Sequence, residues 1–235
     1  MSTLDSARIE DTYAEAFRSI YAEVLVTARD AKWLEHMVHA VTGHASSTIM
    51  CDCEAGLDRY VGLSAGDEPE TPDGRPGAVL QFHVPRFRKD RQAALEKALL
   101  SRISQNVLTC PTARCFNLID SEDYFRLGRK ISYFGDGFER RETRYGRPVW
   151  VVPTMGGEFV MDRRGGYRNG IMGGNLWFMG IDADAAIDAA ERVAGAVDGG
   201  PGDLQLFAFR HAIIADRALE TNRVSQQHKV EILTG

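Results

Sequence analysis

The chain has 235 residues, 44% of them apolar, and a formal net charge of −5 at pH 7. This balance excludes a general nucleic-acid-binding protein, because binding to phosphates needs a predominantly basic surface. We expect neither a signal peptide nor a membrane span, and hence a cytoplasmic protein, because acidic residues are frequent near the start and no run of 18 apolar residues occurs.

The four cysteines form the pairs Cys51-x-Cys53 and Cys110-x4-Cys115. Neither spacing is typical of a zinc site, and no histidine lies close to either pair in the sequence. Reduced thiols that pack in the core are the simpler interpretation. We therefore expect no metal centre.

The first half of the chain predicts strands and helices in the order β-α-β-β-α-β. Trp33, Met37 and Val41 recur four residues apart behind an N-cap at Asp30, and Gly43 is expected to end that helix. The expected strands are 21–28, 46–53, 78–84 and 130–134, and the expected helices are 30–41 and 90–108. This order is typical of the ferredoxin-like α+β fold, in which two helices cover one face of an antiparallel sheet.

The segment SSTIMCDCEAGLD, residues 46–58, combines a strand-like apolar run with two carboxylates. Glu54 and Asp58 flank Gly56 where the predicted strand stops. Carboxylates at such a strand end can hold a substrate or move a proton. The alternative is a solvated turn with one capping carboxylate.

The second half predicts strands at 148–153, 158–162 and 170–181, followed by a helix from Asp182 to Val197. These elements make about half of another ferredoxin-like unit. We therefore expect a complete N-terminal ferredoxin-like lobe over residues 1–145, an incomplete second lobe over 146–202 and a divergent tail over 203–235. A strand at 203–209 and a helix at 211–223 are expected in that tail.

Many blocks of the sequence resemble, in order and spacing, the formylmethanofuran:tetrahydromethanopterin formyltransferase family. The resemblance covers approximately residues 8–200 and ends beyond Pro201. The matching blocks are IEDTYAEAF at 9–17, VLVTA at 24–28, KW at 32–33, IMCDCEAGLD at 49–58, ETPDGRPG at 70–77, RISQNVLTCPTA at 102–113, ISYFGDGF at 131–138, GRPVW at 146–150, GEF at 157–159 and GIMGGN at 170–175.

This resemblance implies transfer of a formyl group between methanofuran and N5 of tetrahydromethanopterin, with these carriers as substrates and no tightly bound metal or redox cofactor. The setting is methanogenesis or methylotrophic formaldehyde oxidation, and the predominance of arginine over lysine favours a bacterial, methylotrophic one. The resemblance also implies two ferredoxin-like lobes in a longer chain and a homo-oligomer, a dimer or tetramer, with hydrolase subunits in a bacterial complex.

Formyl transfer requires attack on an amide carbonyl, a tetrahedral oxyanion and delivery of a proton to the departing amine. A partly buried carboxylate with a raised pKa suits the proton transfer. The candidates are Glu54, Asp58, Asp136 and Glu158, of which Glu54 leads because an apolar strand precedes it. Cys51 and Cys53 are weak nucleophile candidates, because no base is identifiable beside them.

Gly173, Gly174 and Asn175 are the candidates for stabilising the oxyanion, because fixed N–H donors and an amide side chain suit that role. A β-bulge or a tight turn is the alternative for this Gly-Gly-Asn sequence.

The carboxylate-bearing tails of both carriers suit an arginine with planar, bidentate geometry, and Arg75 in the PDGRPG turn is the first candidate. An exposed arginine on a rigid turn is the alternative. Ser47 and Thr112 are candidates for the polar edge of the pterin, although each can equally satisfy the backbone.

Two hypotheses of different classes remain open at this point. The first is an active formyltransferase. The second is a truncated, non-catalytic relative that binds pterin or a partner subunit, because the resemblance implies that the unmatched part contributes a catalytic carboxylate.

Overall fold

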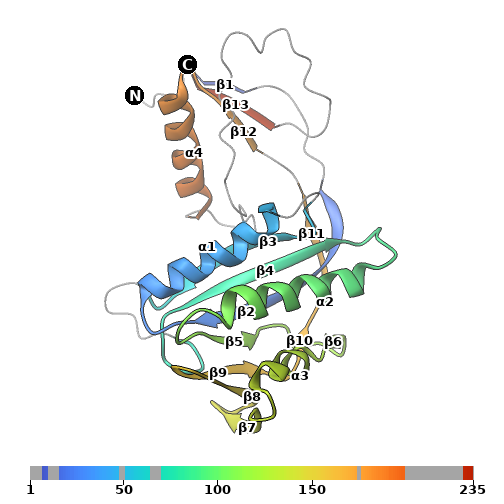
Figure 1. Ribbon diagram of the computed structural model, residues 1–235. Helices are drawn as coiled ribbons and strands as arrows, with labels where there is room; N and C mark the ends of the chain where they lie inside the picture. The colour runs from blue at the N-terminus through green and yellow to red at the C-terminus, as the bar shows by residue number, and fades with distance from the viewer. Residues whose placement is uncertain are drawn as a thin grey trace. The chain divides into compact units, whose positions relative to one another are not determined.

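The computed structural model describes residues 7–9, 16–47, 51–63, 70–173, 176–198 and 230–234 (Figure 1). The chain divides into two compact units. One comprises residues 18–172, and the other combines residues 1–17 with 173–235. In the described part of the chain, no helix is long and apolar enough to cross a membrane.

The larger unit is built on an antiparallel sheet in which β3, β4, β2 and β5 are neighbours in that order. The chain order is β-α-β-β-α-β, and the sheet order places the first strand beside the third and the fourth, as in the ferredoxin-like fold. The expected α+β class and the expected topology are thus confirmed here. The elements are β2 (Phe17–Thr27), α1 (Ala31–Ser47), β3 (Glu54–Val61), β4 (Gly77–Pro85), α2 (Arg91–Arg102) and β5 (Arg114–Asn117).

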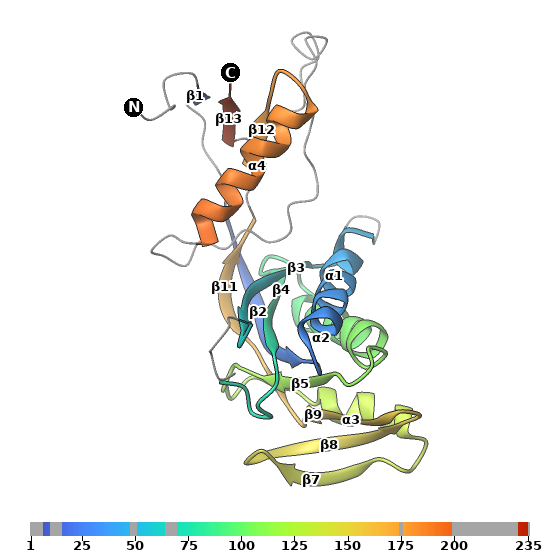
Figure 2. The same cartoon turned by 90° about the vertical axis from the view of Figure 1, so that its left-hand side faces the viewer.

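Helices α1 and α2 cover one face of this sheet, as the two views show (Figures 1 and 2). Alternate residues of β2 and β4 point toward these helices, because side chains along a strand alternate between its faces. The resulting core is continuous, and burying it supplies most of the driving force for folding. Its members include Ile20, Ala22, Val24, Leu34, Met37, Leu80, Phe82, Val84, Leu95 and Leu99.

The prediction of a strand at 46–53 is wrong. Helix α1 continues to Ser47, and β3 begins only at Glu54. Gly43 does not end the helix, because Val41 and Ala45 extend the buried stripe by another turn. A glycine within a helix costs only about 1 kcal/mol relative to alanine, so burial of that turn can offset it.

The prediction of a strand at 130–134 is also wrong. Residues Leu127–Ser132 form helix α3, and Tyr133–Gly135 form a 3-10 turn, η3. Short apolar runs are ambiguous between helix and strand, and here Leu127 and Ile131, four residues apart, are both buried. The fourth ferredoxin-like strand is instead β5. The expected second helix is found, but its last part, Ile103–Val107, is a π-helical segment, η2.

Strands β7 (Arg140–Arg144), β8 (Arg147–Thr154) and β9 (Gly157–Asp162) continue the same sheet, because β9 pairs in parallel with β5. The two short strands β6 (Tyr124–Phe125) and β10 (Gly165–Gly166) pair with each other. Strands predicted at 148–153 and 158–162 are thereby confirmed. Position 145, expected as a lobe boundary, lies within the larger unit.

The segment expected as one strand at 170–181 is two strands. Strand β11 (Arg168–Met172) pairs with β2 in the larger unit, and β12 (Leu176–Met179) belongs to the smaller one. In the smaller unit β13 (Val230–Thr234) lies between β1 (Ala7–Ile9) and β12.

Helix α4 (Ala183–Asp198) confirms the predicted helix of the smaller unit. The Asp182 carboxylate accepts a hydrogen bond from the backbone N–H of Ala185 at 2.8 Å, which is the expected N-cap. The elements expected at 203–209 and 211–223 lie outside the described residues.

Candidate active site on the sheet face opposite the helices

The face of β2 and β4 opposite the helices carries polar side chains near one end. Ser19, Tyr21 and Glu23 alternate along β2 with the core residues. In the antiparallel register Tyr21 lies opposite His83 of β4, and Glu23 lies opposite Gln81. Strand β3 adds Glu54 opposite His83. Directly paired residues share a face, so these side chains form one polar layer.

Hydrogen bonds join four of these side chains into a row. Ser19 Oγ lies 3.0 Å from His83 Nδ1, and His83 Nε2 lies 3.0 Å from Gln81 Oε1. Gln81 Nε2 donates to Glu23 Oε2 at 3.0 Å. The imidazole also stacks on the Tyr21 ring, with centroids 4.7 Å apart and planes 4° from parallel. The row therefore ends on a carboxylate that is only partly buried.

Glu23 has an elevated proton affinity. Burial is the main reason why its pKa is raised above the ordinary glutamate value, and the nearby carboxylate of Asp58 raises it further. The charges of Arg59 and Arg168 and the hydrogen bond from Gln81 act in the opposite direction without cancelling the shift. A carboxyl group with a raised pKa suits general acid–base catalysis.

Asp58 reaches this face because β3 bulges at that position, between Leu57 and Arg59. Its side chain is 3% exposed and forms an ion pair with Arg59. A bulge adds one residue to a strand and redirects the side chain there. Asp58 consequently lies close enough to Glu23 to influence its charge.

Strand β11 pairs with β2 and lies on the side of the sheet away from α1 and α2 (Figure 2). Arg168 Nε donates to the Tyr21 hydroxyl at 2.6 Å, and the guanidinium lies 5.3 Å from the centre of the Tyr21 ring. Gly170 gives this strand its close approach, since a Cβ there would lie 2.6 Å from Tyr21 Cδ1. The site is thus covered on one side while Arg168 stays exposed.

We expect Gly170→Ala to destabilise the larger unit by about 1–3 kcal/mol, because the added methyl group overpacks against Tyr21. Urea unfolding followed by circular dichroism measures this change. Gly156→Ala is the matched control, because nothing lies within 4 Å of a Cβ at Gly156. Equal stability of the two variants would contradict the packing of β11 on Tyr21.

Among the predicted acids, Glu54 and Asp58 are brought to this face. Glu23, Gln81 and His83 also lie there and were not predicted. Glu54 lies at the start of β3, on the side of the sheet that carries His83. A signal for the missed residues was present in the sequence. Polar residues alternate with core residues in SIYAEV and in VLQFHV, as in a strand whose second face is not apolar.

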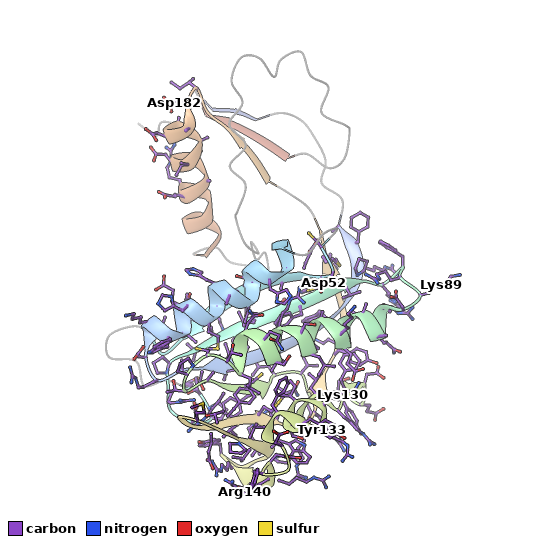
Figure 3. The ribbon with its side chains drawn as sticks, in the orientation of Figure 1. Asp52, Lys89, Lys130, Tyr133, Arg140 and Asp182 are labelled. Carbon is purple, nitrogen blue, oxygen red and sulfur yellow. The ribbon has the colours of Figure 1, made fainter. Side chains whose placement is uncertain are left out.

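Two predicted acids lie elsewhere. Asp136 lies between α3 and β7. It is exposed, and its backbone adopts the left-handed conformation with φ at 51°. Figure 3 labels its neighbours Tyr133 and Arg140 at this end of the unit, and in the sheet order β7 lies at the edge opposite β3. Glu158 pairs with Arg140 and Arg144 in a surface network. These positions do not join the polar layer.

The predicted substrate residues Arg75 and Thr112 do lie together, at the other end of β2. Arg75 donates to Asp73 at 2.7 Å through Nε, to the Thr112 carbonyl at 2.7 Å and to the Thr27 hydroxyl at 2.9 Å. The side chain of Asp73 is fully buried and also pairs with Arg114. Burial acts to raise the pKa of Asp73, but the Thr27 hydrogen bond and the arginines outweigh it and lower that pKa. The observed contacts of Arg75 hold the 71–75 turn, and its role toward a substrate stays a prediction.

The other predicted residues are Ser47, Gly173, Gly174 and Asn175. Gly173 is exposed with φ at 94°, a conformation that favours glycine. Gly174 and Asn175 lie outside the described residues. Ser47 is the last residue of α1, and its side chain also lies outside them. Their roles stay predictions.

The cysteines do not form a reactive cluster. Cys53 and Cys115 are buried, and burial raises the pKa of the Cys53 thiol to about 12 and that of Cys115 still further. Cys51 is exposed. Within the described part of the chain, no group of three histidine, cysteine, aspartate or glutamate side chains is placed to hold a metal ion.

Comparison with known families gives two matches that together span most of the chain. The model for formylmethanofuran-tetrahydromethanopterin formyltransferase matches residues 2–154, and the model for the proximal lobe of the same enzyme matches residues 157–215. The second match continues past residue 200, where the sequence resemblance was expected to end.

Curated relatives with that name share about two fifths of their residues with this chain. The Methanosarcina mazei protein is 42% identical over 209 residues, and the Methanocaldococcus jannaschii protein is 38% identical over 208. The alignments cover 86% and 85% of this chain, but only 67% and 66% of those relatives. The chain therefore spans about two thirds of the length of the relatives it matches.

Two solved structures resemble the fold at TM-scores near 0.7. The formyltransferase from Methanosarcina barkeri gives 0.69 at 40% identity, covering 80% of this chain and 60% of that one. The formyltransferase/hydrolase complex from Methylorubrum extorquens, solved with methylofuran, gives 0.70 at 34% identity, covering 86% and 64%. The second relative is thus part of a complex that includes a hydrolase.

Proposed function

Because the chain belongs to the formylmethanofuran–tetrahydromethanopterin formyltransferase family, we propose that it transfers a formyl group between methanofuran, or a close analogue, and N5 of tetrahydromethanopterin. The family match over residues 2–154 carries this proposal, because it includes every strand of the polar layer except β11. We further propose that the chain acts with a hydrolase partner, because the Methylorubrum relative belongs to a formyltransferase/hydrolase complex. The homo-oligomer that the sequence resemblance implies remains a proposal on that resemblance alone.

We place the chemistry at Glu23. In the direction toward the pterin, N5 attacks the formyl carbon of formylmethanofuran, and the carbonyl oxygen becomes an oxyanion. The carboxylate of Glu23 takes the proton from N5 and gives it to the nitrogen of methanofuran as the bond from that nitrogen to the formyl carbon breaks. The reaction neither consumes nor releases a proton overall. One carboxyl group can therefore accept the proton from the attacking nitrogen and donate it to the departing nitrogen, and the same transfers operate in the reverse reaction.

Cations beside Glu23 complete this proposal. Arg59 and Arg168 are exposed and near enough to Glu23 to influence its charge. We assign them to the oxyanion or to the anionic tails of the carriers, because guanidinium groups bind such oxygens in planar geometry. Glu54 and Asp58 remain proposed members of the same site. Gly173, Gly174 and Asn175 remain a proposal from the sequence alone as oxyanion donors, and they are not assigned to this face. Ser47, Arg75 and Thr112 remain proposed contacts to the carriers.

The proposed function is tested with formylmethanofuran that carries ¹³C in the formyl group. The purified chain is mixed with this donor and tetrahydromethanopterin, and ¹³C NMR follows the label. We expect the label to move to N5 of the pterin at a rate proportional to protein concentration. A folded chain that binds the pterin and leaves the label on methanofuran would instead identify a non-catalytic relative.

A further inference from the structure

His83 is buried yet bonded on both sides of its ring. It is 4% exposed, contacts Ser19 through Nδ1 and Gln81 through Nε2, and stacks on Tyr21. Burial of a polar ring requires a partner at each nitrogen, and here those two partners connect the imidazole to a carboxylate. The hydrogen-bonded row Ser19–His83–Gln81 ends at the carboxylate of Glu23.

The direction of each hydrogen bond in this row follows from the last one. A carboxylate accepts hydrogen bonds, so the Gln81 group that contacts Glu23 is the NH₂ donor. The other end of the amide is then the Oε1 acceptor, and it requires a proton on His83 Nε2. His83 is neutral near pH 7, because burial lowers its pKa to about 4. Nδ1 therefore carries no proton and accepts from the Ser19 hydroxyl.

We propose that Ser19 and His83 are positioning residues that hold the Gln81 amide with its donor toward Glu23, and that this orientation sets the proton affinity of Glu23 in the reaction. The inference rests on the proposed function for its catalytic consequence. The tautomer of His83 and the orientation of the Gln81 amide do not depend on that function.

Without the imidazole, only the Glu23 carboxylate still orients the Gln81 amide. When Glu23 is protonated, the amide is then free to flip and accept a hydrogen bond from the carboxylic acid, which stabilises the neutral form of Glu23. The other groups that act on Glu23 would be unchanged, namely Asp58 and Arg59 of β3 and Arg168 of β11. Loss of the row therefore predicts a further upward shift of the Glu23 titration.

The first test uses the unmodified chain. ¹⁵N NMR of labelled histidine distinguishes the two neutral tautomers, and His83 is assigned from the spectrum of a His83→Phe variant. We expect the proton on Nε2 and none on Nδ1. A proton on Nδ1 would overturn the proposal, because Nε2 could then no longer donate to Gln81.

The second test follows Glu23 itself through the ¹³C signal of its carboxyl group, assigned from Glu23→Gln. Gln81→Met removes the donor directly and gives the largest upward shift of the midpoint. His83→Phe keeps a ring against Tyr21 but removes both nitrogens, and we expect it to move the midpoint in the same direction. His44→Phe is the matched control, because His44 contacts Asn106 through its ring instead, and it should leave Glu23 unchanged.

Unchanged titration of Glu23 in a folded His83→Phe chain would overturn the proposal. If that variant does not fold, Ser19→Ala replaces it. Loss of the donor to Nδ1 frees the imidazole to carry its proton on Nδ1 instead of Nε2 and so releases the Gln81 amide, and we expect a smaller upward shift of the Glu23 midpoint. No shift in Ser19→Ala would overturn the proposal. At acidic pH we expect the kcat of His83→Phe to fall about fivefold below that of the wild type, as expected for loss of one hydrogen bond. If the Glu23 titration shifts but the pH dependence of kcat does not, the hydrogen-bonded row does orient Gln81, and Glu23 is not the group that carries the proton in the reaction.

Discussion

Replacing Glu23 with glutamine is expected to lower kcat for formyl transfer about 100-fold to 1,000-fold, the usual loss when a general acid–base group is removed. Glutamine keeps the shape of the side chain and an acceptor for the Gln81 amide, but it cannot carry the proton between the two nitrogens. Initial rates at saturating concentrations of both carriers measure the effect. Glu122→Gln is the matched control, since Glu122 is an exposed glutamate outside the polar layer.

The same substitution should stabilise the fold near neutral pH. Folding raises the pKa of Glu23 above its ordinary value, so the folded state binds the proton more tightly and is penalised when the group is ionised. The gain in stability of Glu23→Gln over the wild type is therefore complete above the pKa of Glu23 in the folded state. It is lost as the pH falls through that pKa toward the pKa of the unfolded chain. Lower activity with lower stability would indicate a folding defect and contradict a catalytic role.

Replacing Asp52 with asparagine is expected to destabilise the larger unit by about 3 kcal/mol, because it leaves a buried arginine charge without its counter-ion. Arg102 is fully buried, and its two terminal nitrogens contact the Asp52 carboxylate at 2.5 and 3.1 Å. Burial acts to raise the pKa of Asp52, but the hydrogen bonds and charge of Arg102 outweigh it and lower that pKa. Figure 3 labels Asp52, which precedes β3.

Urea unfolding of Asp52→Asn measures this loss, and Arg102→Met in the same chain should recover much of it by removing the unpaired charge. Asp90→Asn is the control, because Asp90 pairs with Arg88 at the surface, where such pairs contribute about 0–1 kcal/mol. A loss of stability no larger than that of the control would contradict the importance of the buried pair.

The sequence predicted the ferredoxin-like order because the apolar patterns of β2, β4 and α2 are long and regular. It failed where a pattern was short. The run before Cys53 has β-branched residues typical of a strand, yet α1 continues to Ser47, because Ala45 completes a buried face that only the tertiary fold provides. The prediction for residues 130–134 was wrong for the same reason, since packing of Ile131 determined their helical state.

The candidate site was only partly predictable. Glu54 and Asp58 stood out because they flank Gly56 after a strand-like apolar run, whereas Glu23 was marked only by the alternation of polar and apolar residues along its strand. The proton affinity of Glu23 depends on Asp58 and on Gln81, which lie far away in the sequence and meet it only through the register of three strands. No local pattern contains that information.

The most direct test of proton transfer by Glu23 is the pH dependence of kcat for the wild-type chain, with both carriers saturating so that the titration belongs to the ternary complex. We predict that kcat rises with pH through a single ionisation above the ordinary glutamate value, because Glu23 must be deprotonated to accept the proton and its pKa is raised by burial. A kcat that does not change across the acidic and neutral range would contradict proton transfer by Glu23.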